Sequence, residues 1–367
     1  MHHLQFFPSR TLAFYMGRSF LVRVLAVLTL LVLVLQTLDL LGESGNILSY
    51  PGNGQAELWQ YVGLRVPQIV ARFLPFSVLL GTLVTLATLN QNSEVIAMKA
   101  AGLSAHQVLA PLMVVAMGIA VVSFTFNDRI VAPTSAKLDA WEAVEYGPIP
   151  KDTLIKTQIW VRDGNDLIHA GMVGGRGTGT TLREVEIFNR SNNILNDIIR
   201  APNGRFDTRT GNWVLEGARR FDVAAGTARA IGQFHFGRAI RPDQFTLSKV
   251  DADGLSLVEL GEAISDLHDA GRPTAALEAG WWHKISGPLS SLLMPLLGSV
   301  AAFGLARSGR LFVRAVIGMS LGFAYFVADN FGLAMGNLGA YPPLMAAWAP
   351  FLLFLLVGET VLIRTEE

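Results

Sequence analysis

Two arginines that stand seven residues apart, with a glutamine between them, form the chain's most suggestive chemical grouping. Arg65 and Arg72 fall within about 20° of one face of a helix, and Gln68 lies between them. An arginine inside a membrane span is expensive and usually faces a cavity or a partner. Charge-assisted arginine bonds suit a phosphate group, which makes this trio a candidate anion site. The alternative is snorkelling to the outer interface, which fits Arg65 better than the deeper Arg72.

Two carboxylates, Asp39 and Asp329, also lie within apolar stretches, toward the outer ends of the first and fifth. Intramembrane charges are functional candidates by default. The competing interpretation is structural, with Asp39 pairing with Arg72.

A short polar segment, 92–102, interrupts the apolar stretches and starts with Asn92-Ser93 before a run of helix formers that ends at Gly102. This pattern predicts a capped helix of about two turns. Such a helix usually lies along the lipid interface. The functional alternative is a coupling helix that docks in a groove on a cytoplasmic motor subunit. Its candidate contact residues are Ser93, Glu94, Met98, Ala101 and Gly102.

Other patterns offer little catalytic chemistry. The glycine-rich run 174–179 has no Gly-Lys pair, so it is not a Walker A loop, and a loop between strands is the better interpretation. The seven histidines lack ligand spacing, cysteine is absent and no Gly-x-Ser-x-Gly elbow occurs. We therefore expect no catalytic residue, no metal site and no cofactor. Energy for transport would have to come from another chain.

Six long apolar runs, three on each side of a polar block, must position these residues. Most reach the roughly 20 residues that cross a bilayer. A mean hydropathy of +0.40 with 16% charged residues agrees with a membrane protein. The first run lacks a cleavage site, so we expect a retained span. The runs are Phe20–Leu41, Phe73–Leu89, Val108–Phe126, Ile285–Ala306, Ala315–Met335 and Leu344–Ile363.

Lysines and arginines in the short loops predict the orientation. They flank the first span at its start, occur in the loops after the second and fourth spans, and follow the sixth. The opposite loops, 42–60 and 336–343, contain none. Both termini are therefore predicted to be cytoplasmic, with the polar block outside, which is the periplasm in a cell with two membranes.

The polar block reads mostly as short strands separated by turns. Asp163-Gly164 indicates a hairpin, and Asn203-Gly204 and Thr210-Gly211-Asn212 indicate further turns. This spacing favours an antiparallel sandwich or jelly roll. A capping box at 256–259 then opens a return helix that Gly271 ends. The expected division is 1–127 for spans one to three, 128–279 for the β jelly-roll-like domain and 280–367 for spans four to six.

Several local motifs in order resemble the permease family of bacterial lipopolysaccharide export, the LptF/LptG family. Segment 93–102 is similar to its cytoplasmic signature, and Tyr341-Pro342-Pro343 is closer to the LptG branch than to the LptF branch. The resemblance spans the whole chain. Further matching motifs are Tyr15-Met16-Gly17-Arg18, residues 74–81 (LPFSVLLG) and Trp282-His283-Lys284-Ile285.

The resemblance implies an α-helical polytopic permease half in the inner membrane, a non-hydrolysing subunit of an ABC-type exporter. It implies an LptF-like partner, an LptB-like ATPase dimer and an LptC-like periplasmic protein. The complex would take lipopolysaccharide from the outer leaflet of the inner membrane and pass it to a periplasmic bridge. No nucleic-acid partner is expected. The alternative is a membrane-anchored periplasmic receptor or assembly factor without transport activity, which would not need a coupling helix.

One departure from the family concerns its lysines near the outer end of span one, which contact lipid A phosphates. The matching positions are Gln36, Gly42 and Glu43. The resemblance therefore leaves Arg65, Gln68 and Arg72 as the candidates for that contact. It also places Asp39 and Asp329 on the helices that line the family's lateral gates.

Overall fold

The computed structural model describes most of the chain, in ten segments. They are residues 9–148, 156–175, 179–191, 194–223, 225–237, 240–242, 245, 252–269, 273–303 and 311–364.

Long helices make up both ends of the chain and confirm a polytopic membrane protein. Five helical stretches within the described residues are long and apolar enough to cross a bilayer: Arg10–Ser49, Gln55–Gln91, Ala105–Glu142, Val316–Asn337 and Pro343–Arg364. The fourth predicted span, 285–306, lies on α8 (Ala275–Phe303), and its last residues are outside the described part. The other long helices are α1 (Arg10–Ser49), α2 (Gln55–Gln91), α4 (Ala105–Phe126), α9 (Leu311–Asn337) and α10 (Pro343–Arg364).

Helix α8 is the centre of the helical part, because it contacts α2, α4, α9 and α10. Its buried leucines join a core that includes Leu79 and Leu112 of α2 and α4. Helix α1 instead packs on α2 and α4 and leaves about half of its large apolar side chains exposed. Exposed apolar surface on a membrane helix is available to lipid or to another membrane helix.

The third membrane helix does not end where the sequence suggested. After α4 the chain continues through one π-helical turn, η1 (Asn127–Val131), into α5 (Ala132–Glu142). The expected domain division at 127/128 falls inside this continuous helical run, and among the described residues the first strand begins at Lys156. The division at 279/280 likewise falls inside α8.

The inserted block is an all-β unit, as predicted. Its strands form one antiparallel sheet in the order β1-β2-β3-β4-β5-β6. Within the described residues this is a meander, without the Greek-key crossovers and second sheet of a jelly roll. The strands are β1 (Lys156–Asp163), β2 (Asp166–Gly174), β3 (Thr181–Ser191), β4 (Ile194–Asp207), β5 (Asn212–Asp222) and β6 (Thr227–Phe236).

Two of the three predicted turns are present. Asp163 pairs with Asp166 across a hairpin, and a turn follows Asp207 and ends at Gly211. The prediction of a turn at Asn203-Gly204 was wrong, because both residues lie inside β4. A Cβ on Gly204 would come within 2.8 Å of the Leu215 side chain. The glycine therefore serves close packing in the sheet core rather than a turn.

Helix α7 (Leu257–Asp269) returns the chain to the membrane part. Its predicted capping box is present: Ser256 N donates to Glu259 Oε2 at 2.9 Å, and Glu259 N donates to Ser256 Oγ at 3.3 Å. Leu257 N also donates to Asp128 Oδ1 at 2.6 Å, which ties α7 to the π-helical turn. The predicted end at Gly271 lies outside the described residues.

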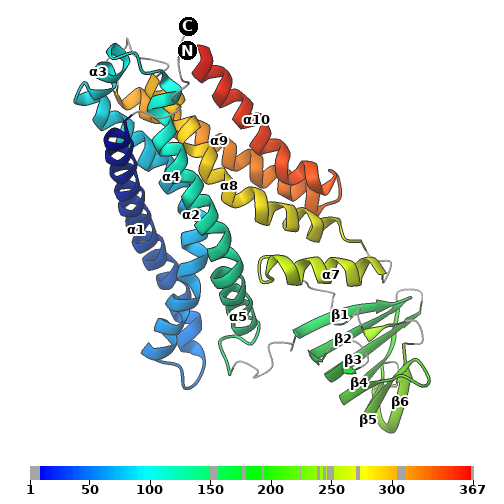
Figure 1. Cartoon of the computed structure of the whole chain (residues 1–367). Coiled ribbons are helices and arrows are strands. Elements are labelled where there is room, and N and C mark those ends of the chain that lie inside the picture. The colour runs from blue at the N-terminus through cyan, green and yellow to red at the C-terminus, as the bar shows by residue number, and fades with distance from the viewer. Residues whose placement is uncertain are drawn as a thin grey trace.

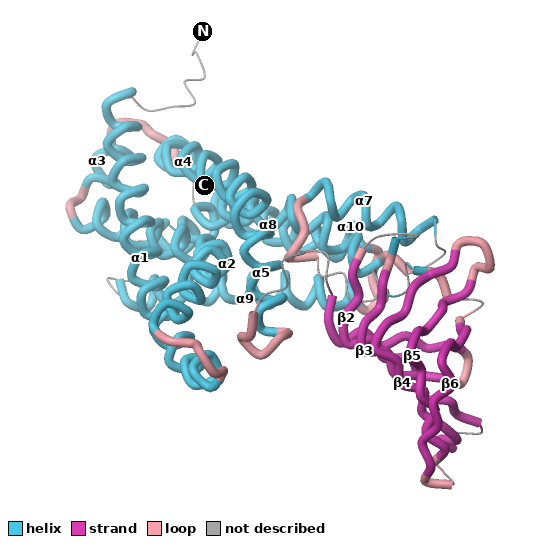
Figure 2. The backbone as a smooth tube through the Cα atoms, turned by 90° about the horizontal axis from the view of Figure 1, so that it is seen from below, coloured by secondary structure: helices cyan, strands magenta, loops and turns pink. Residues whose placement is uncertain are grey.

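The helices and the sheet lie side by side with α7 between them. The start of α1, the end of α10 and the short helix α3 (Glu94–Ala100) share one end of the molecule, opposite the sheet (Figure 1). From below, the strands gather at one side of the helices (Figure 2). One face of the sheet carries its buried core, which includes Ile168, Val185 and Trp213.

Candidate functional site

A network of polar side chains joins the C-terminal part of α1 to the N-terminal part of α2. Arg65 Nη2 lies 3.0 Å from Asp39 Oδ1, and Arg65 Nε lies 3.2 Å from Asp39 Oδ2. Tyr61, which is fully buried, donates its hydroxyl to Asp39 Oδ2 at 2.6 Å. Arg65 Nη1 donates to Gln68 Oε1 at 2.7 Å. The guanidinium is therefore fixed from two sides by residues of this chain.

The two arginines that the sequence grouped as one site have different surroundings in the structure. Arg65 is the ion-pair partner of Asp39, so the predicted pair of Asp39 with Arg72 was wrong. Arg72 is exposed, and within the described residues it makes neither an ion pair nor a side-chain hydrogen bond. Of the predicted trio, Arg72 alone presents a guanidinium free to meet an external anion.

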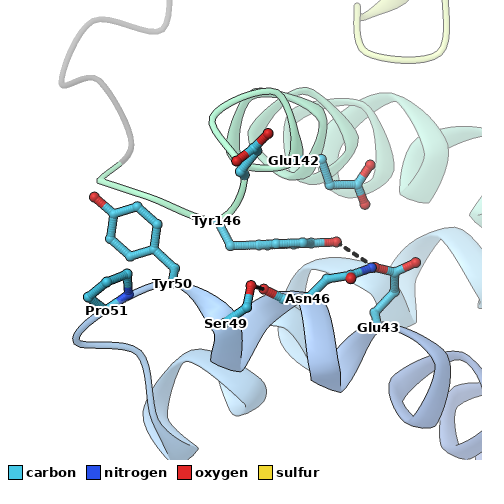
Figure 3. Close-up of a pocket in the computed structure, with 8 residues that line it drawn as sticks. Glu43, Asn46, Ser49, Tyr50, Pro51, Glu142 and Tyr146 are labelled. Carbon is cyan, nitrogen blue, oxygen red and sulfur yellow. Dashed lines mark hydrogen bonds between the residues drawn. The ribbon is translucent and has the colours of Figure 1, made fainter.

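A cavity of about 580 Å³ opens beside this network (Figure 3). Tyr146 crosses it and donates to Glu43 Oε2 at 2.9 Å, and Asn46 Nδ2 donates to the same oxygen at 3.0 Å. Burial and the Glu43 carboxylate raise the pKa of the Tyr146 phenol, so Tyr146 stays a neutral donor. The lining residues are Glu43, Asn46, Ser49, Tyr50, Pro51, Glu142, Glu145 and Tyr146.

The sequence did not predict most of the residues that line this cavity. Glu142, Glu145 and Tyr146 follow the third membrane helix and were assigned to the β block, because the continuation through η1 into α5 was not foreseen. The only available signal was the helix-forming composition of residues 135–145, which favours helix over strand. The cavity is lined by glutamates, whereas the sequence predicted that arginines would contact the ligand.

The second predicted carboxylate has a histidine partner. His283 Nε2 lies 3.0 Å from Asp329 Oδ2, which joins α8 to α9. Both side chains are more than half-buried. Asp329 therefore links two helices, and His283 was noticed in the sequence only as part of a motif. Gln36, the other position of interest on α1, is buried, and its amide has no hydrogen-bond partner among the described residues.

The predicted cytoplasmic helix exists as α3, but two details differ. Ser93 has a left-handed backbone (φ 60°) and its side chain makes no cap bond, so the predicted cap was wrong. Met98 is 7% exposed and packs in the core, which removes it from the outer contact face. The end at Gly102 (φ +86°) is as predicted, because Leu103 N donates to Met98 O at 3.1 Å.

Glu94 links α3 to the first membrane helix. Tyr15 Oη donates to Glu94 Oε1 at 3.3 Å, and Asn92 Nδ2 donates to the same oxygen at 3.2 Å. The exposed surface of this segment includes the apolar residues Ile96, Ala97 and Ala101 as well as the charged Lys99. A force on that surface would thus reach α1 through Glu94 and Tyr15.

Comparison with known proteins identifies the family. The family model "Lipopolysaccharide export system permease LptF/LptG" matches residues 14–364. The chain belongs to the LptF/LptG permease family. It is 27% identical to the lipopolysaccharide export system permease protein LptG of Escherichia coli K12, over 97% of this chain and 99% of that protein. It is 24% identical to the LptG of Haemophilus influenzae Rd, over the same shares. The resemblance inferred from the motifs is confirmed.

As a member of the LptF/LptG family, the chain is a multi-pass permease subunit of lipopolysaccharide export. Two of its family-like motifs have structural roles that the sequence did not reveal. Tyr15 holds the short helix α3 through Glu94, and His283 holds α9 through Asp329.

Proposed function

We propose that this permease subunit extracts lipopolysaccharide from the outer leaflet of the inner membrane and delivers it to a periplasmic bridge. The observation that supports this most is the family match across 14–364, which includes the helices, α3 and the β unit. The Lys and Arg distribution supports cytoplasmic termini and a periplasmic sheet. The start of α1, the end of α10 and α3 share one end of the molecule, opposite the sheet, as that topology requires.

The driving force is proposed to come from separate chains. An LptB-like ATPase dimer would contact α3, an LptF-like permease would complete the membrane channel, and an LptC-like protein would stand beside it in the periplasm. This chain itself would not hydrolyse ATP. The exposed outer side of α3, with Ile96 and Ala97 next to Glu94, offers an apolar surface for a groove on the ATPase.

Replacing Glu94 by lysine is expected to uncouple ATP hydrolysis from export. The substitution reverses a charge in the first turn of α3 and removes the acceptor for Tyr15, with a loss of roughly 0.3–1 kcal/mol from the helix dipole alone. The chain should still insert, since the core of the helical part is untouched. Lipopolysaccharide release and ATPase activity would be measured on the reconstituted complex.

The matched controls for this test are Glu94→Gln and Tyr15→Phe. Glu94→Gln keeps an acceptor oxygen without the charge, and Tyr15→Phe removes only the bond to α1. A complex with Glu94→Lys that exports normally and retains its ATPase would show that α3 is not the coupling element.

Arg72 is proposed to bind a phosphate of the lipid headgroup. Arg72→Gln should lower cross-linking of lipopolysaccharide several-fold with little change in thermal stability, because no ion pair or side-chain hydrogen bond within the described residues is lost. Arg72→Lys should be intermediate, since the charge remains and the planar fork is lost. Unchanged cross-linking in Arg72→Gln would eliminate Arg72 from the substrate path.

A further inference from the structure

A row of polar and aromatic side chains crosses the sheet on the face opposite its core. Register places Trp160 opposite His169, His169 opposite Glu186, Glu186 opposite Arg200, and Arg200 opposite Arg219. Residues directly opposite each other on antiparallel strands point to the same face. The row therefore runs from β1 to β5, over four strand spacings or roughly 19 Å.

An apolar row lies next to the polar one on the same face. Leu167 is opposite Phe188, Phe188 opposite Ile198, and Ile198 opposite Phe221. Trp160 leans across both rows: its ring stacks on Phe188 at 5.7 Å with an angle of 21° and lies 4.6 Å from the His169 ring. Trp160 is still 52% exposed. Two aromatic neighbours thus pack against an indole that remains about half exposed.

The arginine end of the row has an unbalanced charge. Arg200 Nε lies 2.8 Å from Glu186 Oε1, so one guanidinium is neutralised. Arg219 is exposed directly opposite Arg200 and has no carboxylate partner among the described residues. Like charges directly opposite each other destabilise a sheet. Because Glu186 already balances the charge of Arg200, an external anion at Arg219 would balance the positive charge that remains at this end of the row.

We propose that this face, the Trp160–Arg219 row with its flanking apolar residues, binds the phosphorylated saccharide of the exported glycolipid. The C–H face of a sugar ring packs on an exposed indole, and arginine forks hold phosphate. The length of the row suits a short oligosaccharide rather than one sugar. The inference rests on the proposed export function and names a second contact for the same substrate, on the sheet rather than in the membrane.

The test uses the full chain in lipid nanodiscs and an oligosaccharide probe. The probe is the phosphorylated oligosaccharide released from lipopolysaccharide by removing its acyl chains, and a second sample is treated with phosphatase. Trp160→Leu keeps apolar cover on Phe188 but should weaken binding of both samples at least fivefold. Arg219→Glu breaks no carboxylate pair within the described residues and should weaken binding of the phosphorylated sample at least tenfold, with little effect on the other.

Arg205→Ala is the matched control. Arg200 and Arg205 both lie on β4, both side chains are 66% exposed, and each is paired with one glutamate. Arg200→Ala should weaken binding of the phosphorylated sample, whereas Arg205→Ala should change it less than twofold. Melting temperatures of all variants would show that the sheet remains folded.

Three results would overturn the proposal. The wild-type chain could fail to bind the probe, Arg205→Ala could weaken binding as much as Arg219→Glu, or all variants could bind like wild type. Variants that bind the probe normally but lose a copurifying protein would make this face a protein interface instead. Growth that depends on export tests the proposed function separately: a chain that sustains export without binding the probe contradicts only this inference.

Discussion

Asp39→Ala is expected to destabilise the membrane part by about 2–3 kcal/mol. The carboxylate accepts from Arg65 and from the buried Tyr61, and its removal leaves a part-buried guanidinium without its partner. Asp39→Asn should be milder, because an amide oxygen can still accept from Tyr61. Thermal unfolding of the purified chain, followed by size-exclusion, measures both.

The double variant Asp39→Ala with Arg65→Met separates a structural pair from a functional one. If Asp39 mainly neutralises Arg65, removing both charges should recover part of the lost stability. Arg72→Gln is the matched control on the same helix and should leave the unfolding temperature nearly unchanged. Stability equal to wild type in Asp39→Ala would show that the network does not stabilise the contact between α1 and α2.

Gly81→Val is expected to separate α1 from α2 and to reduce sharply the amount of folded protein in the membrane. A Cβ at Gly81 would lie 3.1 Å from both the backbone N and Cα of Val24, and nearer still to its side chain. Because backbone atoms cannot move aside as a flexible side chain can, the helices must part. Overpacking costs about 1–3 kcal/mol even where side chains can adjust, so we expect at least that loss.

Gly63→Val provides the control for Gly81→Val. Both glycines lie on α2, but a Cβ at Gly63 would meet nothing within 4 Å. The intrinsic effect of valine on the helix is therefore common to the two variants, and only the contact with α1 differs. Equal amounts of folded protein for the two, measured by fluorescence size-exclusion, would contradict close packing of α1 on α2.

The sequence alone determined the broad class of this protein. Apolar runs of membrane length must span a bilayer, because their transfer free energy outweighs the local preferences of single residues. Hairpin and capping signals act over a few residues, which is why the hairpin at Asp163 and the box at Ser256 were predicted correctly. The family motifs, spread along the whole chain, indicated a lipopolysaccharide export permease, and the family match confirms it.

Tertiary structure decided everything that depends on which residues meet. Arg65 and Arg72 are nearly equivalent in the sequence, yet only Arg65 reaches Asp39, because helix packing places α1 beside that turn of α2. Asn203-Gly204 has the sequence of a turn. In the structure, however, Gly204 is needed because the Leu215 side chain occupies the space that a Cβ at this position would take. The cavity around Tyr146 exists because one π-helical turn continues a membrane helix into α5. Such contacts join residues up to about a hundred positions apart, and local patterns carry no information on them.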